Sequence, residues 1–72
     1  MTCSERIKEL RASKGLTQKQ LAKESGLSER GVQNYELGER VPTLQAAIAL
    51  ADFFDVSLDY LVGRTDNPEV NR

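Results

Sequence analysis

Four polar residues in one short stretch of the chain have side chains suited to several hydrogen bonds each: Glu29, Arg30, Gln33 and Asn34. Steps of three and four residues connect them, so on an α-helix they share one side, opposite Val32 and Tyr35. Arg can donate two hydrogen bonds to guanine, Gln or Asn can bond bidentately to adenine, and Glu can accept from cytosine. The pattern therefore indicates a helix face that can read base edges. The alternative is a solvated polar face, which most exposed helices have.

The sequence contains little that supports catalysis or metal binding. It has no His, and its one Cys, Cys3, has no general base nearby in sequence. A glycine-rich phosphate loop is also absent, and the residue counts exclude disulfide frameworks and the usual zinc sites. We therefore expect a protein that is not an enzyme, that has no metal or other cofactor and that acts on no small-molecule substrate.

The segment from Thr17 to Glu36, TQKQLAKESGLSERGVQNYE, has the spacing of a helix-turn-helix. Gly26 lies at the turn between its two helices. Apolar or small residues occupy the positions where these helices must pack: Leu21, Ala22, Leu27, Val32 and Tyr35. In this motif the first helix supports a second helix that enters the DNA major groove. An ordinary helical hairpin, in which Gly26 is only a C-cap, is the alternative.

Start and stop signals along the chain predict five helices and no repeat. Each predicted helix begins after a Ser or Thr that can cap it: Thr2, Thr17, Ser28, Thr43 and Ser57. Glu5 and Gln20 complete capping boxes with the first two. The helices are expected to end near 14–15, at 26, at 37–38, near 54 and at 63. The predicted fold class is all-α, a compact five-helix domain over residues 1–63, and the polar residues 64–72 are a tail or linker.

The fourth predicted helix, LQAAIALADFF, is apolar on nearly every side, so we expect it in the middle of the fold. Leu44, Ala47, Ile48, Ala51 and Phe54 recur in it at helical spacing.

Gly31 lies inside the third predicted helix, where a glycine costs roughly 1 kcal/mol relative to alanine. Two explanations are open. The missing side chain lets this helix approach the second helix or the DNA backbone closely, or the glycine is merely tolerated in a marginal helix.

Length and charge constrain the partners of the chain. A chain of 72 residues makes one small domain that association with a second copy would help to stabilise. Its 10 basic and 11 acidic residues give a net charge of -1, divided into +2 up to Pro42 and -3 from Thr43 onward. Such a chain should bind DNA poorly without specific contacts and dimerisation. No apolar run approaches the ~20 residues of a membrane span, and the N-terminus has no signal-peptide core, so we expect a soluble, cytoplasmic protein.

The motifs LTQKQLA, SGLS, VQNYELGER and VSLDYLVG, together with Pro42, occur at compatible spacings. In this combination the chain resembles the phage repressor and Cro family of small helical DNA-binding domains, the XRE type, from about Ile7 to Gly63. The resemblance implies a lambda-repressor-like arrangement of the five helices and base contacts from the four polar residues named above. Two residues depart from the family pattern: Ser25 stands where an apolar residue is common, and Glu39 where Lys or Arg is common.

Phosphate contacts are expected on both sides of the reading helix. Gln18 begins the second helix, where N–H groups and the helix dipole favour an anion, and the family commonly uses this Gln to hold a phosphate. Lys19, Arg40 and Thr43 are further candidates, each of which can equally be an ordinary surface residue. The resemblance also implies an ion pair between Arg11 and Glu36 that orients the third helix and leaves an edge of Arg11 for a phosphate.

The expected function is sequence-specific binding of double-stranded DNA by a two-fold homodimer on a palindromic operator, in a transcriptional regulator that fold analogy suggests is a repressor. Dimer contacts are expected from Leu58, Tyr60 and Leu61, because family members often pair through this region. These three side chains are also more than so short a helix can easily bury. The alternative is that they close the core, above all Leu61. A protein-interaction module and an antitoxin with the same fold remain open as other functions.

Overall fold

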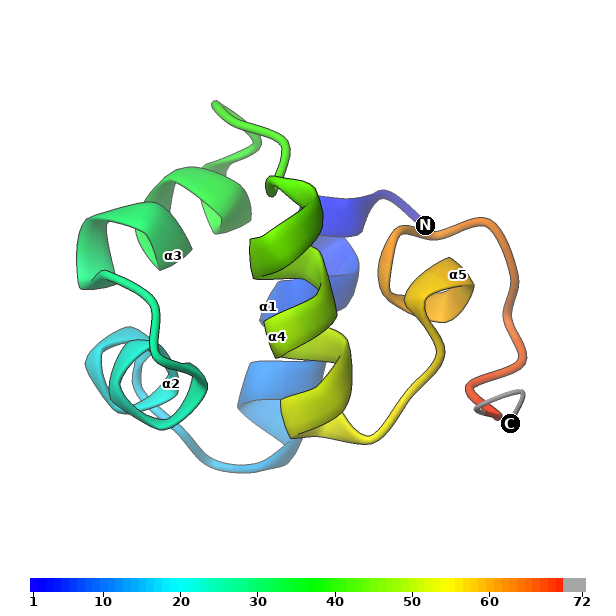
Figure 1. Cartoon of the computed structure of the whole chain (residues 1–72), viewed down its shortest axis with the longest axis horizontal. Coiled ribbons are helices and arrows are strands. Elements are labelled where there is room, and N and C mark those ends of the chain that lie inside the picture. Colours follow the sequence, from blue (N-terminus) through cyan, green and yellow to red (C-terminus); the bar gives the residue numbers. More distant parts are fainter. Residues whose placement is uncertain (70–72) are drawn as a thin grey trace.

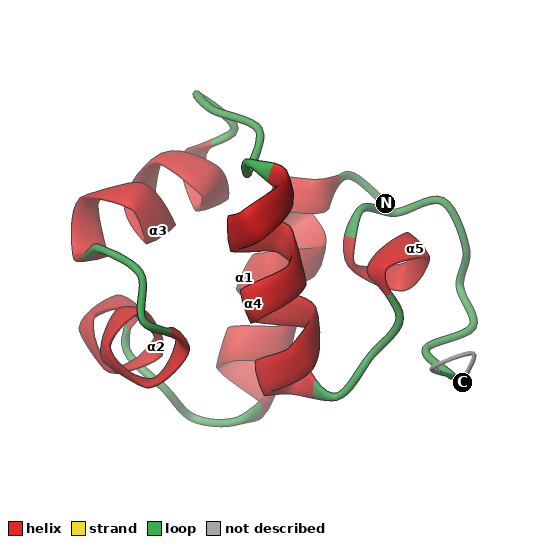
Figure 2. Ribbon diagram, in the orientation of Figure 1, coloured by secondary structure: helices red, strands yellow, loops and turns green. Residues whose placement is uncertain are grey.

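The computed structural model describes residues 1–69, which form five α-helices joined by short loops (Figure 1). The helices are α1 (Cys3–Ser13), α2 (Gln18–Ser25), α3 (Glu29–Leu37), α4 (Leu44–Phe54) and α5 (Leu58–Leu61). Over these residues Figure 2 shows helices and loops and no strand. The predicted all-α, five-helix fold is confirmed.

Each helix begins where a Ser or Thr side chain replaces a missing acceptor of the first turn. The oxygens of Thr2, Thr17, Ser28, Thr43 and Ser57 each accept a hydrogen bond from the backbone N–H three residues later. Glu5 and Gln20 accept the N–H of their own cap residue in return, which completes two capping boxes. The backbone hydrogen bond from Thr2, assisted by its hydroxyl, lowers the pKa of the Glu5 carboxyl. All five predicted helix starts are confirmed.

The helix ends are less regular than the starts. α2 and α3 end at Gly26 and Gly38, both in the left-handed conformation at φ 76°, as predicted. α4 ends instead at Asp55, which has φ 56° and is the one non-glycine residue of the described chain with a positive φ. Asp tolerates this conformation better than most residues, so a helix can end there without a glycine.

The five helices enclose one core to which each contributes a fully buried side chain. In Figure 1, α1 and α4 occupy the middle, with α2 and α3 on one side and α5 on the other. The largest side chains with no exposed surface are Ile7, Leu21, Val32, Leu50 and Leu61, one from each helix in chain order. Burying each is worth about 1.5 to 3 kcal/mol, so no helix is a dispensable addition.

α4 is central but not buried on every side. Ala46, Ala47 and Leu50 are buried, whereas 68% of Leu44 and 45% of Ile48 is exposed. The central position expected for α4 is confirmed, whereas Leu44 and Ile48, which periodicity groups with buried residues, lie at the surface. A sequence that is apolar on every side does not specify which side faces inward. Here Ala46 and Ala47 face inward, where small side chains let neighbouring helices approach closely, while Leu44 and Ile48 lie outside.

Residues 64–69 contain no helix, but they run back along α5 and do not leave the domain. The Ser57 N–H donates to the Pro68 carbonyl at 3.0 Å. The Arg6 side chain, only 4% exposed, lies over the Tyr60 ring at 3.8 Å and donates from Nη2 to Asp66 Oδ1 at 3.2 Å. The described part of the predicted tail is thus attached to α1 and α5. Residues 70–72 of that prediction lie outside the described residues.

Candidate nucleic-acid interface

α3 presents a polar face to the outside of the molecule. Glu29, Arg30 and Gln33 are exposed and Asn34 is half-buried, while Val32 on the opposite side has no exposed surface. Within residues 1–69 none of the four polar side chains makes a hydrogen bond or ion pair. The predicted orientation of the helix is confirmed. Its polar groups are available to an external partner, and their use in base reading stays a prediction.

The turn between α2 and α3 has the geometry that Gly26 predicts. The Leu27 N–H donates to the Ala22 carbonyl at 2.9 Å, and a Cβ at Gly26 would meet no atom within 4 Å. Glycine is therefore required there by its left-handed backbone and not by crowding. Ser25, the departure from the family pattern, donates its hydroxyl to the Leu21 carbonyl at 2.7 Å. A polar residue is accommodated at this turn because its own helix satisfies it.

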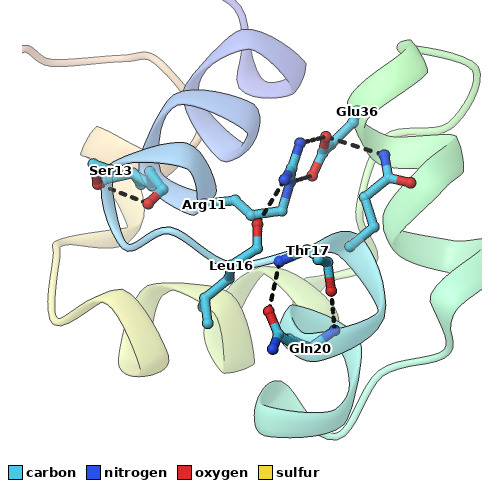
Figure 3. Close-up of polar contacts among 8 residues, drawn as sticks. Arg11, Ser13, Leu16, Thr17, Gln20 and Glu36 are labelled. Atoms are coloured by element: carbon cyan, nitrogen blue, oxygen red, sulfur yellow. Dashed lines mark hydrogen bonds and ion pairs between the residues drawn. The ribbon is translucent and has the colours of Figure 1, made fainter.

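One buried carboxylate connects α1, α2 and α3 (Figure 3). Arg11 donates from Nε to Glu36 Oε2 at 2.7 Å and from Nη2 to Oε1 at 3.0 Å, a two-point ion pair. Its Nη1 donates to the Leu16 carbonyl at 2.7 Å, which fixes the end of the loop, directly before the cap of α2. These bonds to Glu36 raise the pKa of the Arg11 guanidinium. The pair implied by the resemblance is present, and with the Glu36 side chain only 2% exposed it is mostly buried.

Gln18 also contacts the Glu36 carboxylate, and sequence patterns alone do not indicate this contact. Its Nε2 donates to Glu36 Oε1 at 3.2 Å. The amide therefore has a defined orientation before any ligand arrives, with one N–H and the carbonyl oxygen still available. The backbone N–H groups of Gln18 and Lys19 belong to the first turn of α2, where a helix has no internal acceptor. This end of α2 can accept an anion.

The other candidate phosphate residues lie at the surface. Lys19 and Arg40 are exposed, and neither forms an ion pair within the described residues. Thr43 is exposed too; its oxygen accepts the Ala46 N–H at 3.1 Å as the cap of α4, and its hydroxyl hydrogen is still available to a phosphate oxygen. Arg40 follows the end of α3 and lies close enough to Arg30 and Asn34 to line the same hollow.

The environment of Gly31 excludes one of the explanations for a glycine inside α3. A Cβ there would lie 2.9 Å from Ser28 Oγ and 3.9 Å from the Tyr35 ring, both on the α3 side of the motif. No atom of α2 is among these nearest neighbours, so close approach to the second helix is not the reason for the glycine. Two explanations remain: close approach to a ligand on the outer side of α3, and a glycine that is merely tolerated in a marginal helix.

A family model described as Helix-turn-helix matches residues 7–61, which includes both helices of the motif, the turn and the packing residues described above. The chain belongs to this family. Membership confirms two expectations: the domain is of the class found in DNA-binding transcriptional regulators, and it is not an enzyme.

Named relatives and solved structures of the family agree with this assignment. The cryptic phage CTXphi transcriptional repressor RstR of Vibrio cholerae is 38% identical over 64 residues, covering 89% of this chain and 57% of RstR. The HTH-type transcriptional regulator ImmR of Bacillus subtilis is 32% identical over 71 residues, covering 99% of this chain and 56% of ImmR. The P22 c2 repressor, solved with a synthetic operator, matches with a TM-score of 0.81 and 29% identity, covering 86% of this chain and 94% of that one. The chain spans slightly more than half the length of these two curated relatives.

In this helix-turn-helix domain the residues expected at a dimer contact differ in accessibility. Leu58 is 37% exposed and Tyr60 is half-buried beneath Arg6. Leu61 has no exposed surface, so its side chain cannot reach a second copy. Including Leu61 in the interface is therefore wrong, because the four-residue α5 needs this side chain to close the core.

A second group of apolar side chains, each more exposed than Leu58, lies elsewhere on the helix-turn-helix domain. They are Leu37, Val41, Leu44 and Ile48, with exposed fractions of 70%, 85%, 68% and 45%. They belong to the end of α3, the loop that follows and the first half of α4. Sequence reasoning missed this surface because it assigned the α4 residues to the core. Within residues 1–69 there is no cluster of three metal-ligating side chains and no helix long and apolar enough to cross a membrane.

Proposed function

We propose that this chain is the DNA-binding domain of a cytoplasmic transcriptional regulator, which uses α3 to recognise a specific site in double-stranded DNA. The observation that carries the proposal is the outer face of α3, where four polar side chains have no partner in the domain. The helix bearing them is anchored by the buried Glu36 carboxylate. A rigid helix with unpaired donors and acceptors is suited to reading base edges in the major groove. That RstR is a repressor and that P22 c2 binds an operator support repression as the regulatory outcome.

The contacts divide into two groups. Glu29, Arg30, Gln33 and Asn34 face the bases, where Arg suits guanine and Asn or Gln suits adenine. Gln18, Lys19, Arg40 and Thr43 hold phosphates beside the groove, with Arg11 offering its remaining N–H groups next to Gln18. With a net charge of -1, the domain gains little from non-specific attraction, so the base contacts must supply most of the selectivity.

We further propose that two copies bind a palindromic operator as a two-fold dimer. One recognition helix covers few base pairs, and a two-fold pair places two such helices about 34 Å apart, one turn of DNA. Leu58 and the exposed edge of Tyr60 are the proposed contacts on α5. The exposed apolar residues Val41, Leu44 and Ile48 form the alternative surface for this pairing.

The test is selection of bound duplexes from a random pool with the purified chain. A palindromic consensus with half-sites one turn apart supports both DNA reading and the dimer, and a single unrepeated consensus supports reading by a monomer. The control is the double variant Arg30→Ala and Asn34→Ala, which keeps the core intact. It should enrich only a weaker consensus, without the base-pair preferences that Arg30 and Asn34 set in each half-site. Enrichment of no sequence by the parent chain, at moderate salt, would contradict the proposed function.

A protein-interaction role is the second candidate, and the exposed apolar side chains around Leu44 are the observation that favours it. Near-zero net charge suits a protein partner better than a DNA backbone. An antitoxin would combine both activities. Co-purification of a small partner protein with the chain, lost in the variant Leu44→Glu, would support this role.

A further inference from the structure

A hollow of about 320 Å³ lies beside α3 on the side that carries the polar face. Its lining comes from the cap of the helix, from two successive turns of the helix and from the loop after it: Ser28, Arg30, Gly31, Asn34, Tyr35 and Arg40. The lining contains two guanidinium groups and no carboxylate. A concave surface of this composition favours an anion.

The polar groups around the hollow are not used by the domain itself. Within residues 1–69 the side chains of Arg30, Asn34 and Arg40 form no hydrogen bond or ion pair, and the Tyr35 hydroxyl has no partner either. The Tyr35 ring packs against the core, so the position of its hydroxyl is set by buried contacts. A fixed hydroxyl beside unpaired guanidinium groups is a suitable donor for a phosphate oxygen.

Gly31 keeps the floor of the hollow open. A Cβ at this position would lie 2.9 Å from Ser28 Oγ and 4.0 Å from Tyr35 Cζ, the carbon that carries the hydroxyl. Any longer side chain would extend between the cap of α3 and the Tyr35 hydroxyl. The glycine that is unfavourable for the helix therefore gives a ligand access to Tyr35.

We propose that this hollow binds one phosphodiester group of the DNA backbone, through the Tyr35 hydroxyl and the Arg40 guanidinium, and that Gly31 is present to admit it. The inference rests on the proposed DNA-binding function and adds a residue, Tyr35, that faces the core by sequence pattern. Bound there, the phosphate sets the distance between the DNA backbone and Arg30 and Asn34, the base-reading residues on the same rim. Tyr35 and Arg40 are thus positioning residues for the recognition helix.

The test compares three variants on the selected operator and on a random duplex. Tyr35→Phe removes the hydroxyl and keeps the ring, and Arg40→Gln removes the charge. Arg64→Gln is the matched control, because it removes the same charge from the C-terminal segment, where Arg64 is paired only weakly with Asp59 at 3.8 Å. We expect Tyr35→Phe and Arg40→Gln each to bind both duplexes roughly tenfold more weakly, with unchanged unfolding midpoints. The salt dependence of Arg40→Gln should fall by about one released counterion.

Neutral methylphosphonate groups, placed one at a time along the operator, identify the phosphate. One position in each half-site should weaken the parent chain about tenfold and leave Arg40→Gln and Tyr35→Phe almost unaffected, because these variants have already lost the contact. If every methylphosphonate position weakened the parent and both variants equally, the hollow would not hold a phosphate. That result leaves DNA binding intact, whereas a parent chain that binds no duplex overturns the proposed function as well.

Discussion

Among residues 1–69, Glu36 is the only buried acidic residue. Its carboxylate is 2% exposed and accepts three side-chain hydrogen bonds, two from Arg11 and one from Gln18. Removing a carboxylate from water is costly, and the cost is offset only while its oxygens keep their donors. The residue therefore makes the orientation of α3 dependent on α1 and α2, and a change at Arg11 reaches the recognition helix without touching it.

The first prediction follows from this burial. Arg11→Ala should lower the free energy of unfolding by about 2 to 4 kcal/mol, because it leaves the Glu36 charge with only Gln18 as a donor. The double variant Arg11→Ala and Glu36→Ala should lose clearly less than the sum of the two single changes. Urea unfolding measures all three values. Strictly additive losses would show that the ion pair makes no energetic contribution in solution.

A second prediction separates residues that read bases from residues that bind phosphates. Replacing Arg30 or Asn34 by Ala should cost ~1 to 3 kcal/mol on the selected operator and relax the preference at one base pair in each half-site. Gln18→Ala should weaken binding to all duplexes to a similar degree, because phosphates carry no sequence information. Titration of the operator and of single-base variants gives both quantities. If Arg30→Ala lost affinity equally for specific and random DNA, Arg30 would not be a base-reading residue.

At the scale of the helix, the end of α5 is the most restrictive junction of the described chain. Gly63 has φ 83°, and a Cβ there would overlap the carbonyl oxygen of Met1. Gly15 also has a positive φ, 67°, but a Cβ at that position would meet nothing within 4 Å. The two glycines share one backbone requirement and differ in crowding.

The third prediction uses this difference. Gly15→Ala should cost about 1 kcal/mol, the penalty of a left-handed alanine. Gly63→Ala should cost about 2 kcal/mol more, since the backbone of the first residue must also move. Thermal unfolding of both variants makes the comparison. Equal losses would mean that the contact between the start of α1 and the end of α5 does not persist in solution.

Local signals along the chain predict elements better than they predict surfaces. The capping residues determine where each helix starts, because the bond from the Gln20 N–H to the Thr17 hydroxyl, for example, spans only three residues. The exposed side of α4 depends on which helices pack against it, so Leu44 and Ile48 are assigned to the wrong side by periodicity alone. The same limit applies to the candidate site. The outer face of α3 follows from Val32, whereas the bond from Gln18 to Glu36 and the hollow around Tyr35 require the packed structure.

At the scale of the whole molecule, the proposed function requires two copies of the chain to pair. Two apolar surfaces are available, Leu58 with Tyr60 on α5 and the residues around Leu44 and Ile48 on α4. Both must compete with the loss of rotational and translational freedom on association, so a dimer that forms fully only on DNA is expected.

The fourth prediction distinguishes the two surfaces. Leu58→Glu should leave the fold intact, because the side chain is already 37% exposed, and should abolish cooperative binding to the full palindrome. Binding to a single half-site should be unchanged. Ile48→Glu serves as the comparison. Gel-shift titrations on full and half operators report both effects, and loss of cooperativity only in Ile48→Glu would place the interface on α4.

The attachment of the C-terminal segment has a kinetic consequence. The bond from Arg6 to Asp66 joins residues 60 positions apart, whereas the motif helices α2 and α3 are neighbours in sequence. Contacts that close so long a loop are slow to form, so we expect α5 and residues 64–69 to dock after the other helices have folded and to detach before them. Native-state hydrogen exchange should then show the Leu61 amide opening at a lower free energy than that of Leu50. A chain in this partly open state would keep its recognition helix and lose the α5 surface, so its DNA affinity would depend on the time that α5 spends docked.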